Sequence, residues 1–420
     1  MLEHAKRPRA GRGRWLLRAR QERLLLSGRR LWAAVAGLSL DQLVAWGVLY
    51  YAYTVLSVPI AADLGVSRLH VAAAFSVCLL VAGWMGRHVG AVLDARGTRG
   101  SLRLGALLAP LVFAALALVG DMVSLVAAFA LLGVVQALAL YEPAFRTIVD
   151  WCPEERARAR AMLGLTIVGG FASTVFLPLT GWLLARYDWR DTVLVLAVGL
   201  AVVLVPTRFS LPLSSRGGPR AAVARLHAPP SARRLAAGLA LHSLASTGVF
   251  VYLMWHLVEQ GASLGAAAGL AGLAGGAQGL GRLVSGPLRR VAGGTSFLPL
   301  LLGAQAVALL GVVALDGGAM TACVLLFGAA SGVMTLERAT VLIEWYGRAT
   351  FGAHQGRLAA ATSTARAVSP FLVEGGHLFA SYAVVFGVLA AALLLSAWVC
   401  RSAARLHHHE PLPGEWVFSG

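Results

Sequence analysis

The chain of 420 residues is a succession of long apolar runs separated by short polar segments. A helix needs about 20 consecutive, mostly apolar residues to cross the roughly 30 Å hydrocarbon core of a bilayer. Runs of that length can be placed twelve times, near residues 31–57, 68–90, 101–120, 123–147, 158–184, 190–208, 233–259, 263–288, 295–315, 319–345, 354–379 and 380–402. Because 58% of the residues are hydrophobic and only 13% are charged, an ordinary soluble domain is excluded. The sequence predicts an all-α membrane protein with twelve transmembrane helices.

The basic residues lie mostly on one side of this arrangement. The net charge is +17, and ten of the 36 basic residues precede Leu31, whereas the turns on the opposite side carry Arg68, Arg186 and Arg190. The positive-inside rule then places both termini and the polar segment 209–232 in the cytoplasm, with the chain crossing the cell membrane many times. Residues 1–30 are expected to form a basic cytosolic arm, either a helix on anionic lipid or a disordered segment, and residues 403–420 a cytosolic tail.

The chain repeats itself at a spacing of 195 residues. The repeated residues are Gly133, Glu142 and Ala144 with Gly328, Glu337 and Ala339, and Gly86 and Arg87 with Gly281 and Arg282. A constant offset over several motifs indicates a duplication. It predicts two pseudo-symmetric six-helix halves, residues 31–208 and 233–402, joined by the linker 209–232. Such halves hold a substrate between them near the bilayer midplane.

One short polar motif lies between the second and third expected helices. In GAVLDARGTR, Gly90 and Gly97 can bring two helices close together, while Asp94, Arg96 and Arg99 can form a charged latch at the cytosolic surface. The motif resembles the signature between the second and third helices of the major facilitator superfamily of transporters. The resemblance implies the major facilitator fold and a gating role for these five residues. A polar turn that matches the pattern by chance is the alternative.

Two arginines are expected deep in the membrane. Arg366 lies nine residues past Arg357 and Arg282 eight residues before Arg290, which puts each about 12 to 13 Å from the cytosolic end of its helix. An ionisable side chain at that depth is costly, so it needs a partner, a wet cavity or a function. Guanidinium groups bind carboxylates in bidentate fashion, so the pair predicts an anion site. The alternative is that they pair with Glu142, Glu337 or Glu374.

The segments QLVAWGVLYYAYTVL (Gln42–Leu56) and ASTVFLPLTGWLL (Ala172–Leu184) resemble the bacterial branch of the superfamily related to monocarboxylate transporters and oxalate/formate exchangers. The resemblance implies that Arg282 and Arg366 coordinate a substrate carboxylate. Two features of the branch differ here. Gln278 stands where monocarboxylate transporters have an acid, and their first-span lysine, expected near Leu56 or Ser57, is missing. Proton-coupled lactate transport by that route is therefore not expected.

Further candidates come from other polar and aromatic positions in the spans. We expect Gln278 to contribute to the substrate site. We also expect Tyr50, Tyr51, Tyr53, Tyr252 and His256 to line the cavity, with interhelical packing as their alternative. Proton coupling is assigned to Glu142, Glu337 and Asp41, because a carboxylate in a low-dielectric cavity can take up and release a proton. For Glu142 the alternative is an ion pair with Arg146, one helical turn on. For Asp41 it is simple solvation.

The sequence therefore predicts a secondary active transporter that moves a small organic anion, most simply a carboxylate, by symport or exchange. The alternative is a proton-coupled exporter of a drug-like compound or secondary metabolite. A membrane-embedded sensor or enzyme is the third reading, but there is no metal-ligand spacing, no nucleophile motif and no ATP-binding loop. No enzymatic activity, cofactor, metal or nucleic-acid partner is expected. The expected partners are the small-molecule substrate and the lipid bilayer, and the protein is expected to be a monomer.

Overall fold

The computed structural model describes residues 28–152, 154–213, 229–292 and 297–409, without the side chains of Asp94, Ala292, His409 and residues 347–353. Most of the predicted basic arm, linker and tail therefore lie outside the described residues. The helices are α2 (Gly28–Trp46), η1 (Gly47–Tyr51), α3 (Ala52–Asp63), α4 (Arg68–Arg96), α5 (Thr98–Ala115), η2 (Leu116–Leu118), α6 (Met122–Ala139), α7 (Tyr141–Trp151), α8 (Glu155–Gly170), α9 (Ala172–Leu184), α10 (Trp189–Ser210), α11 (Pro230–Glu259), α12 (Leu264–Ala292), α13 (Phe297–Ala314), α14 (Gly317–His377) and α15 (Tyr382–His409).

The helices match the predicted membrane spans. Ten helices in the described part of the chain are long and apolar enough to cross a bilayer. The two remaining predicted spans, near 263–288 and 354–379, correspond to α12 and the second part of α14. These two segments carry Arg282 and Arg366. The fold is the predicted all-α membrane fold, and the count of twelve spans is consistent with it.

The long helix α14 turns back on itself. Its 61 residues would extend about 92 Å if straight. However, Leu342 and Leu358 line one small pocket, so the segments before and after residues 347–353 lie side by side. We call residues 317–346 the first arm of α14 and residues 354–377 the second arm. The arms take the places of the tenth and eleventh predicted spans. The predicted boundary between spans 354–379 and 380–402 is confirmed to within a few residues, because α14 ends at His377 and α15 begins at Tyr382.

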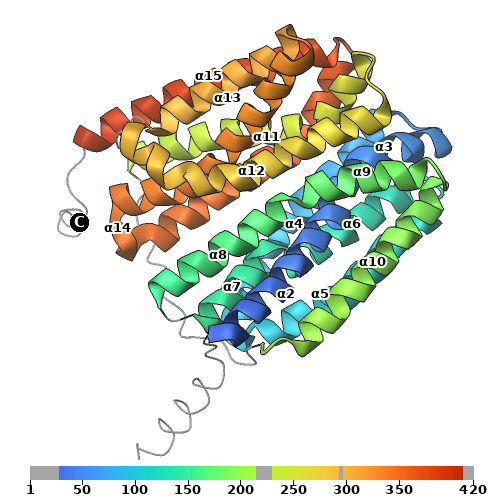
Figure 1. The fold of residues 1–420 in the computed structure, drawn as a ribbon, viewed down its shortest axis with the longest axis horizontal. Coiled ribbons are helices and arrows are strands. Elements are labelled where there is room, and N and C mark those ends of the chain that lie inside the picture. The colour runs from blue at the N-terminus through green and yellow to red at the C-terminus, as the bar shows by residue number, and fades with distance from the viewer. Residues whose placement is uncertain (1–27, 153, 214–228, 293–296, 410–420) are drawn as a thin grey trace, which may run out of the picture.

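Two helix bundles make up the molecule (Figure 1). The first contains α2 to α10 and the second α11 to α15, with α4 packed on α14 and α9 packed on α12 between them. We call the end where α2 begins and α15 ends the termini end, and the opposite end, where α3 stops and α4 begins, the distal end. The bundles correspond to the two predicted halves.

The internal repeat also appears in how the helices pack. Gly133 on α6 lies against the backbone carbonyl of Cys78 on α4, and Gly328 on α14 lies against the carbonyl of Ala274 on α12. A Cβ atom at either glycine would collide with that carbonyl. The contacts are related by offsets of 195 and 196 residues. Close helix crossings through glycine are typical of membrane bundles, and here the same crossing occurs once in each half.

The turn between α4 and α5 is a single glycine. Gly97 has φ of 77°, and its N–H donates to the Leu93 carbonyl at 2.9 Å, so it caps α4 in a conformation that favours glycine. Gly90 lies within α4, and the Arg96 and Arg99 side chains are exposed on either side of the turn. The Asp94 side chain lies outside the described residues. The predicted position of the motif in a tight turn between two spans is confirmed, while its gating role stays a prediction.

A short polar cap starts α6 at the distal end. The Asp121 carboxylate accepts a hydrogen bond from the Ser124 N–H at 2.8 Å and another from its hydroxyl at 2.9 Å. These hydrogen bonds hold the pKa of Asp121 below its usual range. The cap fixes where the helix begins after the break at Gly120.

Candidate functional site

Three arginines lie at the same level of the second bundle. Arg282 is on α12, Arg366 is on the second arm of α14, and Arg338 is on the first arm, eight residues before Tyr346. Counting from the termini end, each lies about 12 to 13 Å along its helix. The charges of Arg282 and Arg366 act on Arg338. Arg338 was not predicted as a site residue, although its distance from the helix end is the same signal that identified the other two.

Tyrosines from the first bundle face two of these arginines. The Tyr141 hydroxyl, at the start of α7, interacts with the Arg282 guanidinium, and Tyr50 interacts with both Arg366 and Thr247. Arg282 is 5% exposed, and it donates from Nη1 to the backbone carbonyl of Thr166 on α8. The site therefore lies between the two bundles, with cations on one side and phenol groups on the other. Tyr141 was not among the predicted site residues.

The local structure of the first span presents these tyrosines. Residues Gly47–Tyr51 form a π-helical segment, η1, between α2 and α3. Such a segment inserts an extra residue into the helix and is frequent at functional sites. It changes the direction of Tyr50 and Tyr51 relative to a regular helix. Tyr51 lies within range of the charges of both Arg282 and Arg366.

The three arginines have no acidic partner in the described part of the chain. The ion pairs found there join Arg68 to Glu374, Arg146 to Asp150, Arg190 to Asp63, Arg208 to Asp41, and Arg289 to Glu337 and Glu344. None involves Arg282, Arg338 or Arg366. Arg282 is buried and Arg338 and Arg366 are half-buried. Charges inside a membrane bundle without partners are expensive, so this concentration of positive charge favours an anion between the bundles.

Other predicted lining residues lie farther from the arginines. Tyr53 stacks on Phe75 with ring centroids 3.7 Å apart, and its hydroxyl interacts with Tyr252. Tyr252 donates to the Pro370 carbonyl at 3.2 Å. The Tyr53 and Tyr252 hydroxyls thus connect the bundles on the distal side of the arginines.

Gln278 and His256 occupy packed positions. The Gln278 backbone carbonyl packs against Gly332, which brings α12 and α14 into close contact. His256 is fully buried, and its ring packs on Phe386 of α15 with centroids 4.8 Å apart. It lies 26 residues before Arg282 in sequence and near the distal end of α11. Packing was the stated alternative for His256, and its surroundings agree with that alternative.

The two repeated glutamates have different surroundings. Glu337 is buried and accepts from Arg289 Nε, with a shortest distance of 2.9 Å. Glu142 packs on Gly86, and within the described residues it forms no ion pair. The alternative pairing of Glu142 with Arg146 is wrong, because Arg146 pairs with Asp150 at 3.3 Å instead. The two glutamates are therefore equivalent in the sequence repeat, but they do not have equivalent ion pairs.

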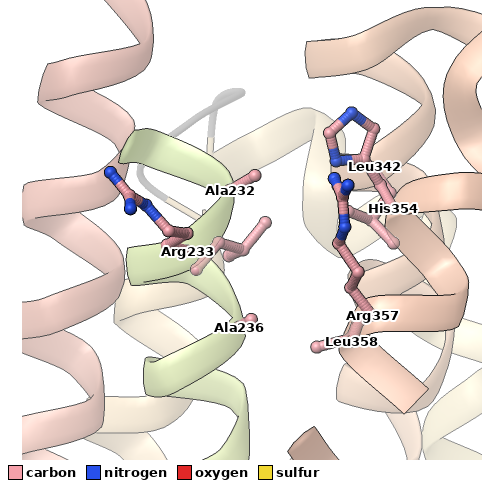
Figure 2. Close-up of a pocket in the computed structure, with 8 residues that line it drawn as sticks. Ala232, Arg233, Ala236, Leu342, His354, Arg357 and Leu358 are labelled. Atoms are coloured by element: carbon pink, nitrogen blue, oxygen red, sulfur yellow. The ribbon is translucent and has the colours of Figure 1, made fainter. Parts of the chain in front are cut away.

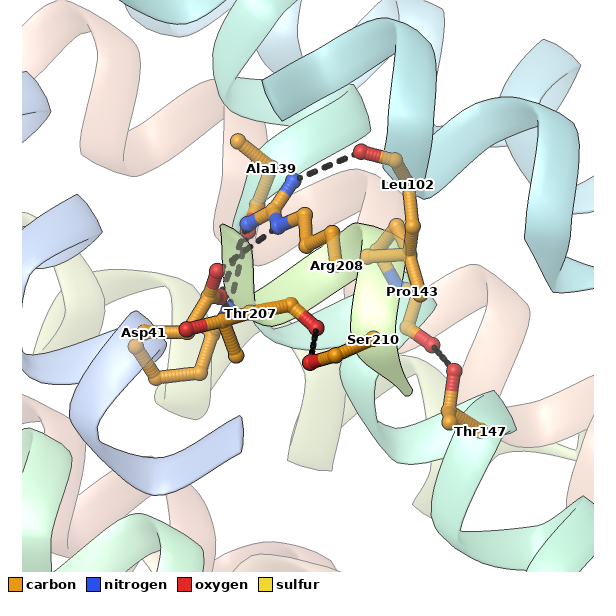
Figure 3. A network of polar contacts seen from close by, with 9 residues as sticks. Asp41, Leu102, Ala139, Pro143, Thr147, Thr207, Arg208 and Ser210 are labelled. Atoms are coloured by element: carbon orange, nitrogen blue, oxygen red, sulfur yellow. Dashed lines mark hydrogen bonds and ion pairs between the residues drawn. The ribbon is translucent and has the colours of Figure 1, made fainter. Parts of the chain in front are cut away.

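Asp41 forms a fully buried ion pair with Arg208 (Figure 3). Arg208 donates from Nε to Asp41 Oδ1 at 2.8 Å and from Nη2 to Oδ2 at 2.9 Å. The same guanidinium donates to the carbonyls of Leu102 at 3.2 Å and Ala139 at 2.7 Å. The alternative of solvated Asp41 is wrong, because neither side chain is exposed. The contacts join α2, α5, α6 and α10, which suits a structural ion pair better than a proton carrier.

The distal ends of the two bundles are joined by polar contacts. Arg68, at the start of α4, contacts Glu374 at 2.9 Å and the Tyr382 hydroxyl at 2.5 Å, and its guanidinium lies over the Trp255 ring. Tyr382 also donates to Glu374 at 2.9 Å. The Trp255 indole donates to the Thr54 carbonyl at 2.7 Å. We call Arg68, Glu374, Tyr382 and Trp255 the distal latch.

A small pocket lies at the termini end of the second bundle, between α11 and α14 (Figure 2). Its volume is about 70 Å³. Its walls are the apolar side chains of Ala232, Leu342 and Leu358, with Arg233 and Arg357 beside them. Pockets for organic ligands have volumes of about 300 to 1,000 Å³. This one is too small for such a substrate, and it is separate from the arginine site. No group of three metal-ligating side chains was found among the described residues.

Two helix bundles with a polar site between them are typical of membrane transporters. The family model of the Major Facilitator Superfamily matches residues 38–336. The chain belongs to this superfamily.

Solved transporter structures have the same fold. The peptide transporter POT, solved in complex with sulfate, is 15% identical with a TM-score of 0.70 over 90% of this chain and 95% of its own. The nucleoside transporter NupG is 13% identical with a TM-score of 0.67, covering 89% and 99%. The human organic anion transporter MFSD10 (TETRAN) is 19% identical with a TM-score of 0.58, covering 88% and 98%. No curated protein matches the chain in sequence. At these identities the likeness establishes the fold, and the substrates of the three differ.

Proposed function

We propose that the protein is a secondary active transporter for a small organic anion, with a carboxylate as the preferred chemical class. The observation that supports this proposal is the set of three arginines, Arg282, Arg338 and Arg366, placed between the bundles without an acidic partner in the described chain. Arginine keeps its charge in a protein interior, and its planar group can bind both oxygens of a carboxylate. The proposal does not depend on whether the chain belongs to the monocarboxylate or the oxalate/formate branch of the superfamily.

The phenol groups of the first bundle complete the site. Tyr50 and Tyr141 can donate to an anion held by Arg366 and Arg282, because their side chains lie within interaction range of those guanidiniums. An anion placed there touches both bundles. Its release therefore requires the bundles to separate at one end, which is the requirement for alternating access.

The proposal includes a location and an orientation. The protein lies in the cytoplasmic membrane with its termini in the cytoplasm, as the uneven distribution of basic residues predicts. The distal end then faces the outside, and the distal latch closes the site to that side.

Uptake into proteoliposomes tests this function. We would measure counterflow of labelled lactate, oxalate, succinate and citrate, and then repeat the measurement for the best substrate with Arg282→Gln and Arg366→Gln. Each lost hydrogen-bonded charge contributes about 1.5 to 3 kcal/mol, so transport at limiting substrate should fall about 10- to 100-fold. Arg401→Gln is the matched control, because Arg401 is exposed near the end of α15. Unchanged transport by both site variants would contradict the proposal.

An exporter of a drug-like compound in exchange for protons is the second candidate. The observation in its favour is Glu142, a carboxylate without an ion pair among the described residues. In this case Glu142→Gln abolishes proton-driven export, while Arg282→Gln and Arg366→Gln change only which compounds are exported. The same variant set therefore separates the two functions.

A further inference from the structure

A half-buried histidine of the second bundle lies at the level of the arginine site. His242 is on α11, eight residues after Arg234, so it lies about 12 Å along the helix, at the level of the three arginines. Arg338 on α14 is the charged side chain that acts on it. Arg282 and Arg366 act in turn on Arg338. No carboxylate of the described residues acts on His242.

The surroundings of His242 offer hydrogen-bond acceptors for a protonated ring. Its Nε2 lies 3.2 Å from the Ser246 hydroxyl, and its side chain also interacts with Gln305 of α13. Gln305 is fully buried, and its Nε2 donates to the Ser331 hydroxyl at 2.8 Å. Its Oε1 has no hydrogen-bond partner among the described residues. A neutral imidazole has one N–H donor, whereas the cation has two.

The surroundings can accommodate both protonation states of the ring. A buried amide oxygen without a partner costs about 1 to 3 kcal/mol, and an N–H of His242 directed at Gln305 would satisfy it. In the neutral ring the other nitrogen can accept from the Ser246 hydroxyl, whereas in the cation Ser246 accepts from the second N–H. The first half has no equivalent arrangement: at the offset of 195 residues, Gly47 and Pro143 stand where His242 and Arg338 do. The arrangement of His242 beside Arg338 therefore occurs in the second bundle and not at the equivalent positions of the first.

We propose that His242 binds the proton that accompanies the anion. The inference rests on the proposed anion transport and names its coupling residue, in place of the carboxylates considered from the sequence. When the site is empty, Arg338 opposes a second positive charge on His242. An anion held by Arg338 and its two neighbours removes that opposition, because it neutralises the nearest charge.

The coupling works in both directions. If a bound anion strengthens proton binding to His242, a proton on His242 must strengthen anion binding by the same factor. Proton and anion then enter and leave the site together, which is the requirement for symport. The proton moves from water to an imidazole nitrogen and returns to water on the other side, with no covalent change in the anion.

Proton uptake on anion binding tests the inference directly. Purified full-length protein in weakly buffered detergent is mixed with lactate, oxalate or succinate; a pH-indicator dye reports proton uptake, and calorimetry reports the dissociation constant. Wild-type protein should take up close to one proton per bound anion, and its affinity should weaken by about tenfold per pH unit above the titration of His242. His242→Gln should bind the anion with no proton uptake and with a pH-independent affinity.

Two further variants keep the test informative. His256→Gln is the matched control, since His256 is another histidine of α11 and packs on Phe386 rather than beside Arg338. It should retain the proton uptake of the wild type. If His242→Gln does not fold, Gln305→Met removes the proposed acceptor, and its proton uptake should appear only at lower pH than in the wild type.

The outcomes separate the two proposals. Proton uptake that persists in His242→Gln contradicts the role of His242, and so does anion binding by the wild type without proton uptake. In both cases the anion function itself stands. If no anion binds to the wild type, the anion function is contradicted and the coupling role with it.

Discussion

The Arg68 guanidinium on the first bundle and the Glu374 carboxylate on the second lie 2.9 Å apart at the distal end. The other ion pairs between described side chains each lie within one bundle: Arg146–Asp150, Arg190–Asp63, Arg208–Asp41, Arg289–Glu337 and Arg289–Glu344. Tyr382 and Trp255 enclose the Arg68 side chain. The bundles cannot separate at this end without breaking the Arg68–Glu374 pair.

Glu374→Gln is expected to open the distal end more often. Loss of the carboxylate charge removes the attraction to Arg68, which is partly screened because Arg68 is 29% exposed. Spin labels at Ser67→Cys and Ser381→Cys, two exposed positions beside the latch, report the separation of the bundles in a background without the native cysteines. A longer distance population should grow in Glu374→Gln and also in Arg68→Gln.

Asp63→Asn is the control for this measurement. Asp63 pairs with Arg190 at 2.6 Å near the same end, but both residues belong to the first bundle. The spin-label distance distribution of Asp63→Asn should match that of the protein with an intact distal latch. Equal distributions in Glu374→Gln and Asp63→Asn would show that the Arg68–Glu374 pair does not hold the bundles together.

Breaking the Asp41–Arg208 pair is expected to destabilise the first bundle strongly. Arg208 is fully buried, so Asp41→Asn leaves an uncompensated charge, at a cost of about 3 to 5 kcal/mol. Asp41→Asn combined with Arg208→Met should lose less than the sum of the two single changes, because no charge remains buried. Thermal unfolding in detergent measures all three. Additive losses would show that the two side chains do not act as a pair.

The phenol groups opposite the arginines predict a change in apparent affinity rather than in folding. Tyr141→Phe removes the hydroxyl that faces Arg282, and Tyr50→Phe the one that faces Arg366. If each hydroxyl also donates to the substrate, the KM for transport should rise about 5- to 10-fold in each variant. Tyr187→Phe is the control, since Tyr187 is exposed at the distal end between α9 and α10. A KM unchanged in both site variants would place the substrate away from these tyrosines.

The membrane fold could be predicted from the sequence because its signals are local or repeated. The length of each apolar run defines a span. A glycine such as Gly97 can end its helix whichever helices surround it. The offset of 195 residues predicted the halves, and the matching contacts of Gly133 and Gly328 agree with it. These signals do not depend on which helix contacts which.

The site could be predicted only in part, because it depends on rotation about each helix. Arg338 follows Glu337 in sequence, but the two side chains point about 100° apart, so Glu337 reaches Arg289 while Arg338 reaches the central arginines. In the same way, the pairing of Asp41 with Arg208 joins the first and sixth spans across 167 residues. No periodic pattern identifies such a partner. Depth along the helix is visible in the sequence, whereas the facing residue is not.

Gly97 gives a test of the turn that carries the motif GAVLDARGTR of the first half. Its φ of 77° is a conformation that side chains with a Cβ rarely adopt, so Gly97→Ala should destabilise the protein by about 1 to 2 kcal/mol. Gly100, three residues on, lies in α5 with open space around it, and Gly100→Ala should be neutral or stabilising by up to about 1 kcal/mol. Thermal unfolding of the two variants in detergent compares them directly. If Gly97→Ala were as stable as Gly100→Ala, the left-handed turn would not be needed to join α4 to α5.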